Sequence, residues 1–142
     1  MMSADELRNR AVLYALIAAG SVIGGCARYL VNVAQLAWLG VNFPWATLFV
    51  NVTGSFVIGF YAAIAGPDGR LFASSRQRQF VMTGICGGYT TFSGFSFETF
   101  QLLRTGHALA ALINLGVSPL SWLVAVWLGH VMATRLNRLK GT

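Results

Sequence analysis

The chain has 142 residues, of which 56% are hydrophobic and only 10% are charged, and its formal net charge is +6. Soluble globular domains carry about 25% charged residues, so this composition excludes an ordinary soluble domain and indicates a membrane protein. The length allows one domain with about four spans of ~20 residues each.

Four apolar segments follow one another along the chain, and each is long enough to cross a bilayer as a helix. The expected spans are residues 11–30, 45–65, 79–102 and 108–133. A span must satisfy its backbone hydrogen bonds internally, so we expect an all-α protein with four transmembrane helices in a single domain over residues 1–142. The first segment could be a signal peptide, but its length and the acids before its arginines favour a retained helix. Ser3 and Glu6 have capping-box spacing, which predicts a short helix before the first span.

Basic residues are distributed unevenly between the two ends of the expected spans. With four spans, the N-terminus, the middle loop and the C-terminus share one side. Eight basic residues fall there, against Arg28 and Arg104 on the other side: Arg8, Arg10, Arg70, Arg76, Arg78, Arg135, Arg138 and Lys140. This bias predicts that both termini face the cytoplasm. No soluble basic domain is present to bind nucleic acid, so we expect none as a partner.

Small residues and cysteines lie within the apolar segments. The run from Gly20 to Gly25 contains small residues four apart, which predicts a face where another helix packs closely. Cys26 and Cys86 lack metal-ligand spacing, and we expect both to be small buried apolar residues. No Ser/His/Asp set and no phosphate-binding loop is present, so the sequence does not predict an enzyme.

Polar residues form stripes on two of the expected spans. Thr47, Asn51 and Ser55 share one helix face, because they are spaced four apart. Asn114 and Ser118 have the same spacing on the last span, and Ser121 follows three residues later. Such groups can bond across helices as packing contacts worth about 0.6 kcal/mol each. Two stripes on two spans also fit the lining of a pathway.

Residues 83–99 read TGICGGYTTFSGFSFET, and this stretch is rich in residues that disfavour a continuous helix. Each helical glycine costs about 1 kcal/mol relative to alanine, so we expect the third span to be broken near mid-membrane. Free carbonyls at a broken helix suit a monovalent cation. Phe92 and Phe95 share a face after the break. Ordinary packing is the alternative reading of this pair.

The run GICGGYTTFSGFSFET resembles the signature of the Fluc/CrcB fluoride channels, and TLFVNVTGSFVIG and GGCARYL resemble that family's second-helix and first-helix motifs. The likeness covers nearly the whole chain, in the same order and spacing. It implies a small four-helix channel that assembles as an antiparallel, dual-topology dimer in the bacterial inner membrane. It also implies passive export of fluoride from the cytoplasm.

The resemblance further implies roles for individual residues. Phe92 and Phe95 would be the pore phenylalanines, with Asn51 turned toward them. The carbonyls of Gly87 and Thr90 would hold a Na⁺ ion shared at the dimer interface. The remaining implied pore residues are Ser93, Asn114 and Ser118. Arg28 and Glu98 are candidates for a vestibule, with a snorkelling arginine and an interfacial backbone cap as the alternatives.

Two features depart from the family pattern. Gly94 stands between the phenylalanines where a hydroxyl-bearing or small residue is usual, which removes one possible donor. The charge bias is also unexpected for a dual-topology protein, and it leaves open a homodimer or a heterodimer with an oppositely oriented paralogue.

Two other classes of membrane protein fit the sequence less well than the channel does. A proton-coupled small multidrug transporter needs a carboxylate in the first span, and residues 11–30 contain none. A non-conducting scaffold subunit would leave the polar stripes and the broken helix without a purpose.

Overall fold

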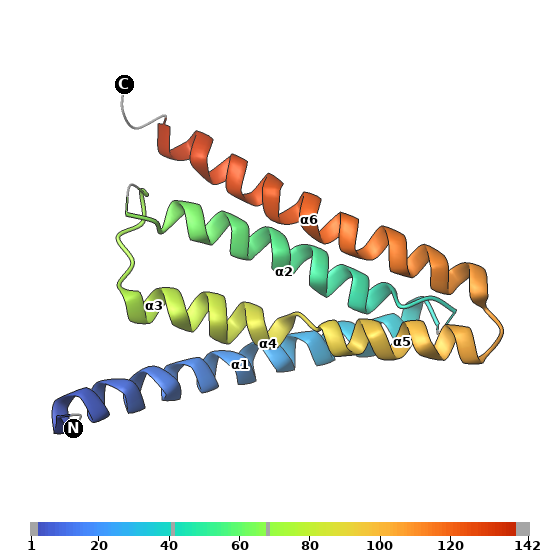
Figure 1. Cartoon of the computed structure of the whole chain (residues 1–142), viewed down its shortest axis with the longest axis horizontal. Coiled ribbons are helices and arrows are strands. Elements are labelled where there is room, and N and C mark those ends of the chain that lie inside the picture. The colour runs from blue at the N-terminus through green and yellow to red at the C-terminus, as the bar shows by residue number, and fades with distance from the viewer. Residues whose placement is uncertain (1–2, 41, 68, 139–142) are drawn as a thin grey trace.

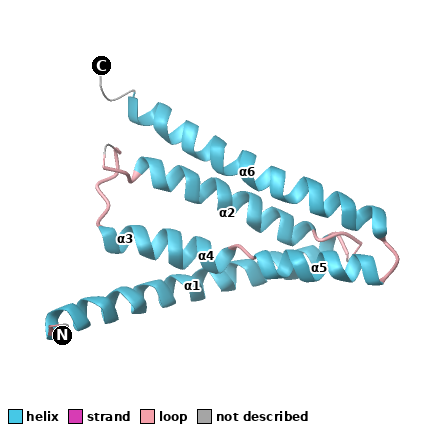
Figure 2. Cartoon of the chain, in the orientation of Figure 1, coloured by secondary structure: helices cyan, strands magenta, loops and turns pink. Residues whose placement is uncertain are grey.

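The computed structural model describes residues 3–40, 42–67 and 69–138, and its regular structure in these ranges is entirely helical (Figures 1 and 2). The prediction of an all-α protein is therefore confirmed for this part of the chain. Lys140, which entered the charge argument, lies outside the described residues.

Within the described residues, three helices are long and apolar enough to cross a membrane, namely α1 (Ala4–Trp38), α2 (Trp45–Ile64) and α6 (Ala108–Arg138). The expected span 79–102 is divided among shorter elements. These are α3 (Ser75–Gln79), the π-helical segment η1 (Phe80–Cys86), α4 (Gly87–Tyr89) and α5 (Phe92–Arg104).

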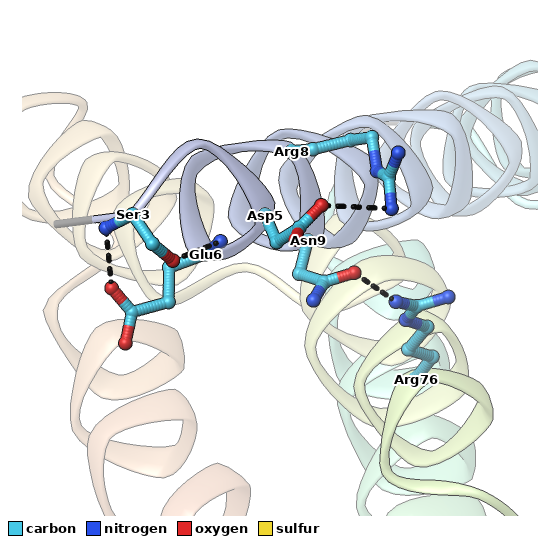
Figure 3. A network of polar contacts seen from close by, with 6 residues as sticks. All are labelled: Ser3, Asp5, Glu6, Arg8, Asn9 and Arg76. Atoms are coloured by element: carbon cyan, nitrogen blue, oxygen red, sulfur yellow. Dashed lines mark hydrogen bonds and ion pairs between the residues drawn. The ribbon is translucent and has the colours of Figure 1, made fainter.

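Helix α1 is one continuous element, so the expected short helix before the first span is wrong. The capping box is nevertheless present, because the Ser3 hydroxyl accepts from the Glu6 backbone N–H and the Glu6 carboxylate accepts from the Ser3 N–H (Figure 3). No helix-breaking residue follows this cap, so the helix it begins continues directly into the apolar segment.

The helical path is interrupted between α4 and α5. Thr90 (φ −81°, ψ 159°) and Thr91 (φ −152°, ψ 121°) both have extended backbones. Before the interruption, η1 and α4 pack against α1, whereas α5 packs against α6. The two extended residues thus transfer the chain from one neighbouring helix to another.

Glycines allow two pairs of elements to approach closely. A Cβ added at Gly24 would overlap the Ile85 carbonyl, and one at Gly20 would lie 2.7 Å from the Phe80 carbonyl oxygen. The predicted small-residue face of α1 is therefore confirmed. Gly59 and Gly129 likewise allow the backbones of α2 and α6 to approach closely, and these two helices lie side by side (Figure 1).

Helix α3 lies at the same end of the molecule as the start of α1 and the end of α6 (Figure 1). Polar contacts connect the elements there. Arg76 of α3 donates from Nη2 to Asn9 Oδ1 of α1 at 2.8 Å (Figure 3). Asn137 of α6 accepts from the Arg70 N–H at 3.1 Å and donates to the Ala63 carbonyl at 3.0 Å. These bonds fix the loop between α2 and α3 against both neighbouring helices.

Candidate ion pathway

Asn51 of α2 is bonded to the interrupted backbone. Its Nδ2 donates to the Thr91 carbonyl at 2.9 Å, and its Oδ1 accepts from the Thr91 N–H at 2.7 Å. The side chain is buried. A single amide therefore satisfies both backbone groups of a residue that lies outside any helix, as buried peptide groups require.

The interruption also removes the usual helical partners of two carbonyls. In a continuous helix the Gly87 carbonyl would accept from the N–H of Thr91, and the Thr90 carbonyl from that of Gly94. Here the Thr91 N–H donates to Asn51, and the Gly94 N–H donates to the Thr91 hydroxyl at 3.0 Å. The pair of carbonyls is a hard-oxygen donor set, which fits a monovalent cation.

Arg28 of α1 reaches this same region. Its Nη1 donates to the Thr90 carbonyl at 3.4 Å, and its side chain is half-buried. The guanidinium thus adds a positive charge beside the interruption. The bond joins α1 to the first residue after α4.

An aromatic cluster follows the interruption. The rings of Phe92 and Phe95 lie 5.5 Å apart between centroids, tilted by 51°. Trp122 of α6 meets both rings edge to face, at 5.0 Å from Phe95 and 6.5 Å from Phe92. Phe95 is 4% exposed, whereas Phe92 is 71% exposed.

A buried row of polar side chains lies between α5 and α6. Ser118 Oγ donates to Asn114 Oδ1 at 2.7 Å, and Asn114 Nδ2 donates to Thr99 Oγ1 at 2.8 Å. Thr99 in turn donates to the Phe95 carbonyl at 2.7 Å. The row is held by its own hydrogen bonds, so the helices are positioned by polar contacts as well as by packing.

Glu98 lies one turn from Phe95 on α5 and is bonded to α2. Thr47 Oγ1 donates to Glu98 Oε1 at 2.8 Å. The other carboxylate oxygen, Oε2, is buried and has no hydrogen-bond partner among the described residues. Glu98 is therefore a contact between helices with one acceptor position free, rather than a cap of nearby backbone.

Two cavities lie along α5. The first, of about 320 Å³, is lined by Asn51, Thr90, Thr91, Phe92 and Trp122 among others. The second, of about 510 Å³, is lined by Glu98, Gln101 and His107 together with Asn32 and Gln35 of α1, and by apolar residues such as Leu36 and Phe43. Phe92 and Trp122 of the aromatic cluster line the first cavity, and Glu98, which lines the second, is the sequence neighbour of Thr99 in the polar row.

The structure brings together most of the predicted site residues. Asn51, Gly87, Thr90 and Arg28 meet at the interruption, and Phe92, Phe95, Asn114 and Ser118 lie between α5 and α6. Ser93 is apart from them, because its exposed hydroxyl bonds only to Thr91 Oγ1, at 3.2 Å. Cys86 is buried as expected, but the expectation for Cys26 is wrong, because it is exposed on the outer face of α1.

Trp122 was missed by the sequence reasoning. It lies four residues after Ser118 and eight after Asn114, so the spacing that defined the polar stripe on the last span also includes it. Tryptophan is usually grouped with the apolar residues of a membrane helix, although its indole carries one N–H donor.

These features define a helical, multi-pass membrane protein with polar and aromatic side chains packed between its helices. The sequence profile described as "CrcB-like protein, Camphor Resistance (CrcB)" matches residues 15–130. The chain is also similar to two proteins named "Fluoride-specific ion channel FluC 1". It is 92% identical to the one from Rhodopseudomonas palustris (strain BisB18), over 99% of this chain and 100% of the relative. It is 58% identical to the one from Bradyrhizobium diazoefficiens, over 97% of this chain and 95% of that relative.

A third relative, "Fluoride-specific ion channel FluC" of Methylocella silvestris, is 45% identical over 90% of this chain and 98% of its own length. The chain belongs to the CrcB-like family, and the family predicted from the sequence motifs is confirmed. Membership places it with membrane transport proteins rather than enzymes.

Proposed function

We propose that this chain is a fluoride-specific ion channel of the bacterial inner membrane that lets fluoride leave the cytoplasm. The observation that carries the proposal is the 92% identity, over the full length of the relative, to a protein named as such a channel. Hydrogen fluoride enters a cell as a neutral acid, ionises there and is trapped. A passive path for the anion therefore suffices to reduce its toxicity.

The geometry supports a route along α5. Fluoride passes from the cavity at Asn51 and Phe92 to the cavity at Glu98, beside the aromatic cluster. Phenyl rings present a positive edge, which attracts a small anion while the rings exclude bulk water. The polar row of Asn114 and Ser118 holds α5 and α6 at the spacing this route needs.

The interruption at Thr90 and Thr91 serves, in this proposal, as a break of the third span near mid-membrane. Non-helical backbone at that depth is tolerated only where protein or a cavity surrounds it. The bonds from Asn51 to Thr91 supply such an environment. The whole chain then forms one four-helix transmembrane unit.

Gly87 and Thr90 would hold a structural Na⁺ through their carbonyl oxygens. Support comes from the loss of their usual helical partners at the interruption. The ion would supply a fixed positive charge beside the anion route. Arg28, whose guanidinium already contacts the Thr90 carbonyl, adds positive charge at the same place and fits the vestibule role.

The working assembly is an antiparallel homodimer, with a heterodimer containing an oppositely oriented paralogue as the alternative. The Phe92 ring is 71% exposed beside the buried Phe95, and a second copy would cover it. Glu98 and Phe92 would then both be enclosed by protein.

Growth of bacteria that lack their own fluoride exporter tests the proposal. Expression of the chain should restore growth in fluoride, whereas expression of Phe95→Ile at equal membrane abundance should not. Failure of the wild-type chain to protect such cells, even together with its nearest paralogue, would contradict the proposed function.

A further inference from the structure

The indole N–H of Trp122 has no hydrogen-bond partner among the described residues. Its Nε1 atom is buried, and it is the one buried side-chain nitrogen of the described residues that makes no hydrogen bond. Leaving such a donor unsatisfied costs about 1–3 kcal/mol. Buried tryptophan N–H groups usually find an acceptor, so an unsatisfied one indicates a place where a ligand supplies it.

The position of Trp122 points to which ligand that is. Its ring lies edge to face with both Phe92 and Phe95, and it lines the 320 Å³ cavity beside Asn51. Contacts with two aromatic rings restrict the orientation of the indole. The indole is therefore held where the proposed fluoride route passes from the cavity to the aromatic cluster.

The neighbouring polar groups already have partners. Ser118 donates to Asn114, Asn114 donates to Thr99, and Thr99 donates to a backbone carbonyl. Asn51 donates to the Thr91 carbonyl. The amides of Asn51 and Asn114 each keep a second N–H, but the bond that each already makes sets its orientation. The indole N–H of Trp122 makes no bond to the described residues, so it can donate to an arriving anion without losing one.

We propose that the Trp122 indole N–H donates a hydrogen bond to fluoride as the ion passes Phe92 and Phe95, and that this bond favours fluoride over chloride. The inference rests on the proposed channel function. Hydrogen bonds to an ionised acceptor are roughly twice as strong as neutral ones. An indole also carries no acceptor oxygen that would repel the anion.

Trp122→Phe tests the inference in liposomes, because it keeps an aromatic ring and removes the donor. Trp127→Phe is the matched control, since Trp127 lies on the same helix and is 61% exposed. We expect Trp122→Phe to lower fluoride efflux by about tenfold and Trp127→Phe to leave it unchanged. A decrease of less than about threefold would overturn the inference while wild-type efflux stands.

Nuclear magnetic resonance of the indole N–H groups tests fluoride binding directly. If Trp122 had only a structural role, fluoride would not shift its N–H signal. The Trp122 signal is assigned by elimination with Trp38→Phe, Trp45→Phe and Trp127→Phe. Sodium fluoride should shift it, and sodium chloride at equal concentration should not. An unmoved signal contradicts the inference. This titration needs neither conduction nor a folded Trp122 variant, so it decides the role of Trp122 even if efflux, and with it the proposed function, fails.

Discussion

Asn51 and Thr91 exchange two hydrogen bonds, at 2.9 and 2.7 Å, although they are 40 residues apart in the sequence. The Asn51 amide thereby satisfies both the N–H and the carbonyl of Thr91, which lies outside any helix. The interruption is maintained by a residue on a neighbouring helix, and the carbonyls and rings around it depend on that residue.

Asn51→Asp should suppress fluoride flux by more than about tenfold. An ionised aspartate cannot donate to the Thr91 carbonyl, so two acceptors would face each other and the interruption would lose one of the two bonds that hold it. Flux from liposomes with equal protein content measures the effect. Asn9→Asp makes the same chemical change at the Arg76 contact, away from the route, and should conduct normally. Normal flux through Asn51→Asp would refute the assignment of Asn51 to the pathway.

Phe95→Ile should lose most of the flux, about tenfold or more, because isoleucine is apolar but has no positive ring edge. Phe92→Ile should behave in the same way. Phe100→Ile, on the same helix with a ring that is 55% exposed, is the control. Efflux and gel-filtration profiles are compared for all three variants. A scaffold subunit would tolerate each change equally, so equal results for Phe95 and Phe100 would count against a channel.

Gly24→Ala should destabilise the folded protein, whereas Gly25→Ala should not. The added methyl group at Gly24 would overlap the Ile85 backbone, and nothing lies within 4 Å of one at Gly25. Overpacking of this kind costs about 1–3 kcal/mol, and an exposed helical Gly→Ala change gains up to about 1 kcal/mol. Thermal unfolding in detergent distinguishes the neighbours. If Gly24→Ala is as stable as Gly25→Ala, the packing of α1 on η1 is not as described.

Removal of Na⁺ should lower fluoride flux reversibly. Protein purified and reconstituted with choline in place of Na⁺, at constant ionic strength, should lose most of its flux and regain it when Na⁺ is returned. The reason is that the carbonyls of Gly87 and Thr90 would lose the cation that compensates for their missing helical partners. Flux that is the same in choline throughout would rule out a structural Na⁺.

The sequence predicted the helical class, the family and most of the residues along α5. Glycine content and the polar spacing on two spans predict the helices and their polar faces, because helix propensity and periodicity are local properties. The family is predicted from the resemblance of three sequence motifs. The bonding of Asn51 to Thr91 could not be predicted from local patterns, since it depends on how α2 and the interrupted segment meet in space.

Trp122 and Cys26 also show that local sequence patterns do not determine the surroundings of a single side chain. Trp122 looked like an apolar residue of a membrane helix, and its unsatisfied N–H becomes apparent only when its neighbours are placed. Cys26 lies beside glycines that pack closely, yet it points to the outer face of α1. Composition indicates that a helix has a buried face, but the packing of the partner helix determines which residues lie on that face.

Fluoride efflux from liposomes that contain this chain alone tests the central claim most directly. A fluoride-selective electrode follows the release, and chloride release is measured in parallel. We expect rapid fluoride efflux with little chloride leak, which requires both a selective path and a competent homo-oligomer. Well-folded wild-type protein that releases no fluoride, alone or with a neighbouring paralogue, would contradict the account.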